Sequence, residues 1–338
     1  MQLDVLLGRV PLAEVPALAR SAEALGFDGL WTTESQHDPF IPLTLASQTT
    51  SRLLLGTAIA VAFPRSPMLT AHTSWDLQAL SGGRFVLGLG TQVRGHIERR
   101  FGLVWESPGP KLRDYILALR AIWDCWQHGT PLAFTSRFYR LTLMTQFFSP
   151  GPLPHPRPPI YIAGVNPYMC RLAGELCDGF HIHPLHSVKY LREVVIPHIE
   201  AGAKKAGRQR TAVTLFAPVF VVTGKHHREM DAAKAAVKQQ IAFYASTRNY
   251  RPVLDIHGWG DIGPMLTQKA AAGDWQGMAR EITDAMLEEF AVLGPEEEIA
   301  ERLKARYAGL LDRLAFYHGY QPGERDAFWR QLITALHA

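Results

Sequence analysis

The segment from Gly88 to Gly102 combines small residues with three arginines, a pattern that can bind an anion. It follows a short apolar run, so we expect a turn between a strand and a helix. Such a turn presents backbone N–H groups to an anionic cofactor at the carboxyl end of a barrel strand. A tight turn before a solvated basic helix is the alternative, because a short glycine-rich match is weak evidence. The candidate cofactor-binding residues here are Gly90, Thr91, Gln92 and Arg94.

A glutamate and a histidine follow the second apolar run, in the sequence Glu34-Ser35-Gln36-His37-Asp38. His37 can protonate or orient a substrate, since the pKa of histidine lies near neutrality. A loop histidine hydrogen-bonded to the backbone is the alternative. We take His37 and Glu34 as the candidate catalytic residues, with Glu34 more a buried hydrogen-bonding partner than a base.

Three histidines lie close together in the run His181-Ile182-His183-Pro184-Leu185-His186. Two histidines spaced by two residues on a strand point to one face, which is a geometry that metal ligands use. A metal-dependent barrel hydrolase would need further ligands at other strand ends, where His37 and His318 are available. We favour the interpretation that no metal is bound and that His181, His183 and His186 contact the substrate.

Short apolar runs alternate with helical patterns along the chain, which predicts a parallel sheet with crossover helices. The pattern breaks at about 130–156, where we expect a strand pair and a loop, and again in an irregular region at about 247–285. No boundary resembles a linker, so we expect residues 1–338 to form a single domain with these two insertions. The eight expected strands are 3–7, 27–32, 53–62, 84–89, 159–163, 179–183, 213–222 and 314–317.

The composition and net charge narrow the classes of ligand and partner that we expect. Of the 338 residues, 47% are hydrophobic and 20% are charged, which is ordinary for a globular protein. The net charge is +4, and acidic residues balance the basic ones locally. We therefore expect a small anionic ligand and neither nucleic acid nor a membrane as partner.

The cysteines and the first residues of the chain indicate the cellular compartment of the protein. Cys125, Cys170 and Cys177 share no CxxC spacing and lie in apolar helical patterns, so we expect buried free thiols. The first residues lack the charged region and cleavage site of a signal peptide. Both observations favour a cytoplasmic protein.

Five segments carry a family resemblance when taken in order: Ala22–Trp31, Leu55–Ile59, Leu80–Gly90, Pro159–Gly164 and Ala173–Phe180. Together they resemble the luciferase-like monooxygenase superfamily, and most closely its branch of coenzyme F420-dependent oxidoreductases. The resemblance covers nearly the whole chain. It implies a (β/α)8 TIM barrel with insertions, in agreement with the strand count.

The resemblance also implies a reaction and a site. The enzyme would transfer a hydride between the deazaflavin F420 and an organic substrate. In the family, an acid and one or more histidines lie beside the cofactor ring at the position of Glu34 and His37, although Ser35 stands where many relatives have histidine. The backbone of Ala163, Gly164, Val165 and Asn166 would hold the cofactor phosphate or tail. A helix N-terminus capped by Asn166 suits that role, and a capped helix alone is the alternative.

The third expected strand carries a further implication of the resemblance. In the family, a bulge here contains a non-proline cis peptide bond that backs the middle ring of the deazaflavin. By position this bond joins Ala58 to Ile59, which makes both residues cofactor-binding candidates. The alternative is an ordinary trans strand in which Ala58 relieves crowding.

Other functions remain open: an FMN-dependent luciferase-like monooxygenase, a metal-dependent TIM-barrel hydrolase using His181 and His183, and a non-catalytic cofactor-binding relative. The three arginines between Gly88 and Gly102 supply more charge than one phosphate needs, which favours F420 over FMN. The aromatic insertions favour a sizeable, partly apolar organic substrate. Relatives commonly dimerise, and we expect a symmetric homodimer through apolar helix residues such as Leu43, Leu45, Ala46, Leu69, Ala71 and Trp75.

Overall fold

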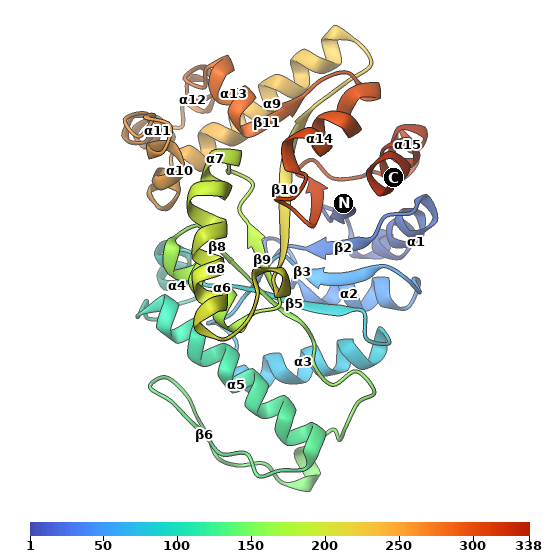
Figure 1. The fold of residues 1–338 in the computed structure, drawn as a ribbon, viewed down its shortest axis with the longest axis vertical. Coiled ribbons are helices and arrows are strands. Elements are labelled where there is room, and N and C mark those ends of the chain that lie inside the picture. Colours follow the sequence, from blue (N-terminus) through green and yellow to red (C-terminus); the bar gives the residue numbers. More distant parts are fainter.

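Eight parallel strands close into a barrel in the computed structural model, which describes residues 1–338 (Figure 1). Each strand pairs with the next barrel strand along the chain, and the last pairs back with the first, which closes the ring. The predicted (β/α)8 barrel is therefore confirmed. In order around the barrel, the strands are β1 (Gln2–Leu6), β2 (Gly29–Thr32), β3 (Leu54–Thr57), β5 (Phe85–Gly90), β8 (Ile160–Gly164), β9 (Gly179–Ile182), β10 (Thr214–Val222) and β12 (Arg313–Phe316).

Helices cover the outside of the barrel, and their ends follow local sequence signals. Gly26 ends the first helix with a φ of 103°, a backbone conformation that favours glycine. Ser66 caps another by accepting a hydrogen bond from the Leu69 N–H. None of the helices combines the length and apolarity needed to cross a membrane. The main helices are α1 (Val15–Leu25), α2 (Phe40–Ser47), α3 (Pro67–Leu80), α5 (Pro108–His128), α6 (Pro167–Leu176), α7 (Val188–Tyr190), α8 (Ile196–Lys205), α9 (His227–Ala245), α14 (Ile299–Tyr307) and α15 (Asp326–His337).

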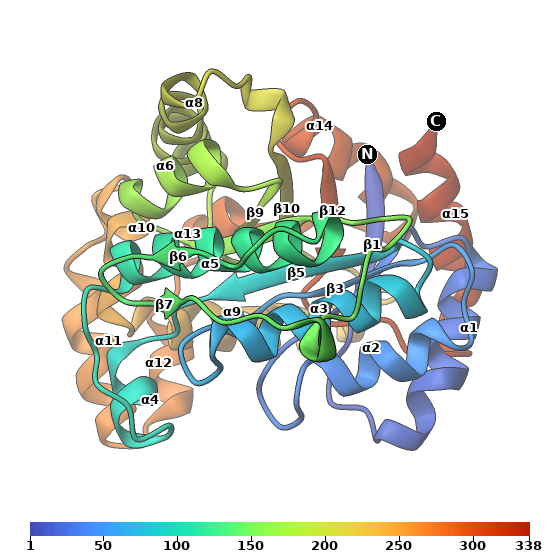
Figure 2. The same cartoon turned by 90° about the horizontal axis from the view of Figure 1, so that it is seen from below.

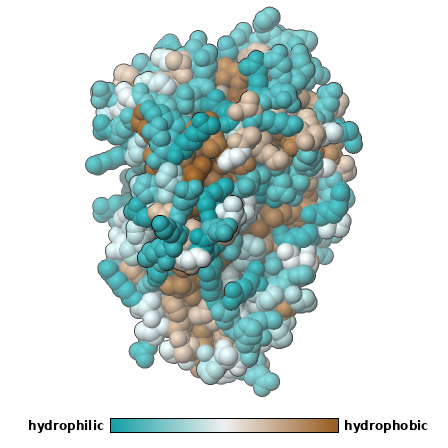
Figure 3. All heavy atoms as spheres, in the orientation of Figure 1, coloured by the Kyte–Doolittle hydropathy of each residue, from teal (hydrophilic) through white to brown (hydrophobic).

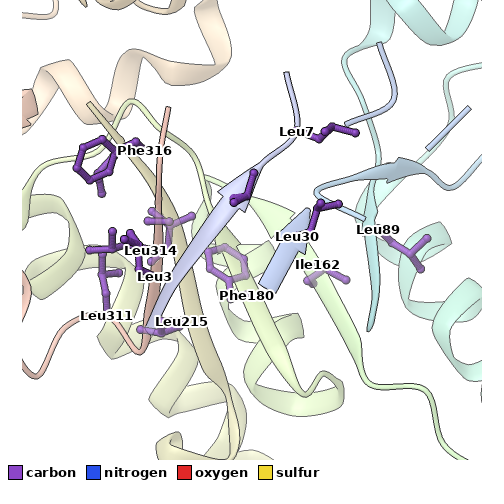
Figure 4. Close-up of a cluster of buried hydrophobic side chains, with 14 of the residues drawn as sticks. Leu3, Leu7, Leu30, Leu89, Ile162, Phe180, Leu215, Leu311, Leu314 and Phe316 are labelled. Atoms are coloured by element: carbon purple, nitrogen blue, oxygen red, sulfur yellow. The ribbon is translucent and has the colours of Figure 1, made fainter. Parts of the chain in front are cut away.

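The strands bury both faces, as expected of a barrel with helices outside. Residues such as Leu3, Leu30 and Leu314 belong to the large outer core between strands and helices (Figure 4). Their neighbours along the strands point inward, where a smaller cluster fills the barrel: Trp31, Val86, Tyr161, Phe216 and Ala315. These inward-facing side chains fill the barrel interior below its mouth.

Two excursions interrupt the alternation of strands and helices. The first, between α5 and β8, holds the short hairpin of β6 (Phe134–Thr135) and β7 (Arg140–Leu141), which lies at the edge of the molecule (Figures 1 and 2). The second was expected to be irregular but forms short helices: α10 (Arg251–Asp255), α11 (Ile262–Ala271) and α12 (Trp275–Arg280). These helices are too short for an apolar period to be legible in the sequence. The chain then continues through α13 (Asp284–Phe290) and β11 (Ala291–Leu293), which pairs with β10.

The expected strand 53–62 is divided by a bulge. β3 ends at Thr57, and a two-residue strand, β4 (Ala60–Val61), then pairs with β5. The peptide bond between Ala58 and Ile59 is cis, which confirms the prediction. Hydrogen bonds tie the bulge to the residues around the end of β2: the Ala58 N–H donates to the Thr32 carbonyl at 2.6 Å. The Ile59 carbonyl accepts from the Glu34 N–H at 3.3 Å.

Candidate active site

Two glycines of β5 make room for the bulge. A Cβ on Gly88 would lie 1.7 Å from the Thr57 carbonyl oxygen, and a Cβ on Gly90 would lie 2.7 Å from the Ile59 side chain. Both glycines are buried. In the sequence we interpreted them as part of an anion-binding turn; in the structure, Gly88 in particular serves the packing of the bulge against the neighbouring strand.

The segments expected to bind the cofactor meet at the carboxyl end of the barrel. Val61 of β4 pairs with Gly90 of β5, and Leu89 pairs with Ile162 of β8. Thr91 and Ala163 directly follow these pairs, and the Ile59 side chain packs beside Gly90, so the three segments lie close together at the mouth. They are Ala58 and Ile59, Thr91 and Gln92, and Ala163, Gly164 and Val165, all partly accessible.

An ion-pair network holds the bulge from the side. The Glu34 carboxylate accepts hydrogen bonds from the Val61 N–H and from the Arg65 guanidinium, each at 2.7 Å. Arg65 also donates to Asp38 at 2.7 Å. Only 8% of the Glu34 side chain is exposed, and both of its hydrogen bonds are to groups next to the bulge. The sequence analysis missed Arg65; the nearby acidic residues and its place just after the third strand were the available signals.

His37 lies on the same loop as Glu34 but makes no hydrogen bond within the protein and is exposed. It lines a small pocket with residues at the end of β1, including Gly8 and Val10, and with Ser35. His37 is therefore not a loop histidine hydrogen-bonded to the backbone, which was the alternative. The ring is free to meet a ligand at the mouth.

The basic segment after β5 forms a short helix, α4 (Arg94–Arg99). Arg94 is 71% exposed and pairs with Glu98 at 2.9 Å. Arg100 donates to the Ser35 carbonyl at 3.1 Å and so joins this segment to the loop that carries His37. Gln92 has a φ of 59°, and its side chain accepts from the Val93 N–H. The arginines therefore do not converge on one point.

The turn from β8 into α6 has the predicted capped form. The Asn166 side chain accepts a hydrogen bond from the Met169 N–H at 3.0 Å, and Pro167 occupies the first helical position. A Cβ on Gly164 would lie 2.4 Å from the Met169 Cβ, so this glycine is needed for packing against α6. Asn166 is exposed at the helix N-terminus, where an anion is stabilised.

The structure separates the three neighbouring histidines. His181 is 4% exposed and lies inside the barrel against Trp31 and Phe216, with neither ring nitrogen hydrogen-bonded. His183 follows the strand end and reaches the mouth. His181 does share its face, as predicted, but sits about 7 Å deeper, because two strand residues span that distance.

His186 turns away from the mouth, and its ring packs against Tyr307 of α14. The expected substrate contacts of His181 and His186 are therefore not supported by their positions. The three rings do not surround a common point. No group of three or more His, Cys, Asp or Glu side chains is arranged to hold a metal ion, so the hydrolase alternative lacks a ligand set.

A cleft of about 370 Å³ lies at the opposite end of the barrel. Pro159 and Asp178, which precede β8 and β9, line it with several arginines. Two of those arginines donate to backbone carbonyls at the end of α6: Arg120 to Leu176, and Arg208 to Gly174 and Cys177. This cleft therefore reflects the capping of a helix and contains none of the predicted site residues.

Comparisons with known proteins agree with the fold. The chain is 48% identical over 309 residues to an uncharacterized protein of Mycobacterium tuberculosis, which covers 91% of each chain. It is 29% identical over 297 residues to 5,10-methylenetetrahydromethanopterin reductase of Archaeoglobus fulgidus, covering 86% of this chain and 85% of the relative. The solved coenzyme F420-dependent tetrahydromethanopterin reductase of Methanopyrus kandleri has the same fold, with a TM-score of 0.80 at 19% identity over 99% and 98% of the two chains.

The luciferase-like monooxygenase family as a whole matches residues 2–313 of this chain. That match spans every strand of the barrel except most of β12. The chain therefore belongs to the luciferase-like monooxygenase family.

Proposed function

We propose that this protein is an F420-dependent oxidoreductase that acts on a small organic molecule. The observation that carries the proposal is the meeting of the Ala58–Ile59 bulge, the Thr91–Gln92 turn and the β8–α6 turn at the mouth. When bound, the deazaflavin supplies the hydride chemistry, and the protein supplies position and electrostatics.

The residues present fit such a group. Ala58 of the bulge has a small side chain and is partly accessible, so a flat ring can approach the backbone there. The capped N-terminus of α6 suits a phosphate or an anionic tail. Ala58, Ile59, Thr91, Gln92 and Ala163 to Asn166 would hold the cofactor, with Arg94 at the rim.

The side chains around the bulge have two different proposed roles, positioning the backbone and transferring a proton. Glu34 and Arg65 fix the bulge, because both bond to it or to each other from one side. His37 is exposed beside this network and would exchange or donate a proton at the substrate. Its unengaged ring is the reason that we assign the proton to His37 rather than to Glu34.

The choice of F420 draws on relatives as well as on charge. One solved structure with this fold is described as dependent on coenzyme F420. The family description, by contrast, names monooxygenases, which is why FMN stays the second candidate. Arg94 and Arg99 near the mouth favour the more anionic of the two cofactors.

Binding titrations with F420 and FMN on the purified protein test the choice. We expect F420 to bind at least about tenfold more tightly, with an affinity that falls as salt rises. Arg94→Gln is expected to weaken F420 binding and its salt dependence. Arg157→Gln, at the opposite end of the barrel, is the matched control and should change neither. Tighter binding of FMN would show that the cofactor assignment is wrong.

The role of His37 has its own test. His37→Ala is expected to lower turnover about 100-fold, within the range of general acid–base catalysis, and to leave F420 affinity unchanged. Turnover is followed by F420 absorbance with the best substrate from a panel of organic compounds. His226→Ala removes an exposed histidine before α9 and serves as the control. Full activity of His37→Ala under chemistry-limited conditions would remove His37 from the mechanism.

We also infer a symmetric homodimer, with a changed set of contact residues. Leu43, Ala46, Ala71 and Trp75 are buried within the chain and cannot meet a partner. The same helices expose other apolar side chains: Ile41 (48%), Leu69 (63%) and Leu80 (44%). Apolar side chains on α2 and α3 that the barrel leaves uncovered are the support for this inference.

A further inference from the structure

Four rings form a continuous group at the barrel mouth, which we call the aromatic wall: His183, Tyr244, Tyr250 and Tyr317. His183 stacks on Tyr250 with ring centroids 3.9 Å apart and meets the Tyr244 ring edge-on at 4.5 Å. Tyr244 contacts Tyr317 through their hydroxyl groups at 2.7 Å. All four residues are half-buried: the three tyrosines pack against the core on one side, and the group stays partly accessible at the mouth.

The aromatic wall lies across the mouth from the bulge. His183 directly follows β9, and Tyr317 directly follows β12. Between these strands in the ring is β10, which is four strands away from β3 in either direction around the barrel. A ligand in the mouth would therefore lie between the bulge and the aromatic wall. Tyr250 comes from the second excursion, so this excursion forms part of the barrel mouth.

The hydrogen bonds of the wall leave two donors free. The Leu185 N–H donates to His183 Nδ1 at 3.1 Å, so the neutral ring carries its proton on Nε2. No protein acceptor is bonded to that nitrogen. The Tyr244 and Tyr317 hydroxyls share one hydrogen bond and have two protons, so one proton remains for a ligand. The wall thus offers N–H and O–H donors beside flat rings.

The wall carries no charge around neutral pH. Burial lowers the pKa of His183 to about 3 and raises the pKa of Tyr250 to about 12. Burial also raises the pKa of Tyr244 and Tyr317. A charged ligand would lose part of its hydration beside these neutral rings without gaining an ion pair from them.

We propose that the aromatic wall is the substrate subsite and that it takes an uncharged, planar, conjugated compound with a carbonyl oxygen. Stacking on Tyr250 and His183 selects the flat ring, and the free donors select the oxygen. The assignment of this ligand as the substrate rests on the proposed function; the binding preference of the wall does not.

Calorimetric titrations of the full protein with three matched probes test the preference. Coumarin is planar and neutral with a carbonyl, naphthalene lacks the carbonyl, and coumarin-3-carboxylate adds a negative charge. We expect coumarin to bind at least fivefold more tightly than either of the others. Equal or tighter binding of the carboxylate would overturn the proposal.

Variants place the probe on the wall. Tyr250→Ala is expected to weaken coumarin binding at least tenfold, and Tyr250→Phe less than twofold, because the phenyl ring still stacks. Tyr317→Phe should weaken coumarin about fivefold and leave naphthalene unchanged. Phe147→Ala, which removes an aromatic ring that is 88% exposed on the first excursion, should change neither. Coumarin binding that is the same in Tyr250→Ala and in wild type would overturn the proposal.

F420 titrations of the same variants separate the two proposals. Unchanged F420 affinity with lost coumarin affinity supports a distinct substrate subsite. Coumarin binding with this pattern in a protein that does not bind F420 would reject the proposed function and keep the aromatic wall. If F420 binds but no wall variant changes coumarin affinity, the aromatic-wall proposal is rejected and the proposed function is kept.

Discussion

The guanidinium of Arg65 donates a hydrogen bond to the Glu34 carboxylate at 2.7 Å, on the same oxygen that accepts the Val61 N–H. One carboxylate oxygen thus joins the loop after β2, the strand after the bulge and the segment that leads into α3. Side chains of both residues are mostly buried, with 21% and 8% exposed. The pair therefore fixes the backbone on which the proposed cofactor ring would lie.

Glu34→Gln removes the charge of this pair and is expected to lower the free energy of unfolding by about 1–2 kcal/mol. It should also weaken F420 binding several-fold, because the bulge loses its lateral support. Urea denaturation and F420 titration measure the two effects. Glu298→Gln is the matched control, since Glu298 pairs with the half-exposed Arg302, takes no part in the proposed site, and such exposed pairs contribute little. Equal effects of the two variants would contradict the positioning role.

Gly88→Ala is expected to destabilise the protein by about 3 kcal/mol or more, because the new methyl group would meet the Thr57 carbonyl at 1.7 Å. The obstacle is backbone and cannot rotate away. Gly8→Ala, also near the mouth, has nothing within 4 Å of its Cβ position and should change stability by less than about 0.5 kcal/mol. Denaturant midpoints of the two variants provide the comparison. Similar midpoints would refute the close packing of β5 under the bulge.

His181 and His186, in addition to His183 of the aromatic wall, predict how stability depends on pH. Burial lowers the pKa of His181 to about 3 and that of His186 to about 4. The unfolded chain, with histidine pKa values near 6.5, then binds more protons than the folded protein below pH 6.5. The free energy of unfolding should fall as the pH drops from 6.5 toward 4, by up to about 1.4 kcal/mol per pH unit for each histidine. Above pH 6.5 these histidines contribute no slope.

The slope can be assigned by substitution. His181→Leu should make the fall between pH 6.5 and 4 shallower, whereas His227→Gln, which alters an exposed histidine at the start of α9, should leave it unchanged. Urea denaturation at a series of pH values gives the slopes. An unaltered slope in His181→Leu would mean that this ring is not neutral in the folded protein.

Leu69→Glu is expected to convert the inferred dimer into a monomer, because it places a charge in the exposed apolar part of α3. Light scattering gives the mass, and circular dichroism verifies the fold. Phe147→Glu alters an even more exposed apolar residue on the first excursion and should leave the mass unchanged. On the face drawn in Figure 3, hydrophobic groups are scattered among mostly hydrophilic ones. A monomeric mass of the wild type at working concentration would contradict the inference directly.

The sequence by itself determined the barrel strands and their order along the chain. Each barrel strand is a short apolar run, and several helix ends have a local signal, such as Gly26 after α1 or Asn166 before α6. These signals act over a few residues and can be read without the fold. The division of residues 53–62 by a bulge came from family resemblance, because small residues alone do not distinguish a bulge from a strand.

Only the tertiary structure decided what the polar residues do. Glu34 and Arg65 are separated by 31 positions and meet because adjacent strands end at the same level of the barrel. His181 and His183 share a strand face, yet one is enclosed by Trp31 and the other reaches the mouth, since depth in the barrel is set by all eight strands together. Tyr250 lies in a segment whose sequence pattern is irregular, yet its ring stacks on His183. The position of Tyr250 depends on how the short helices of this segment pack. Burial, ion pairing and access to a ligand arise from contacts between distant parts of the chain, and no local pattern encodes them.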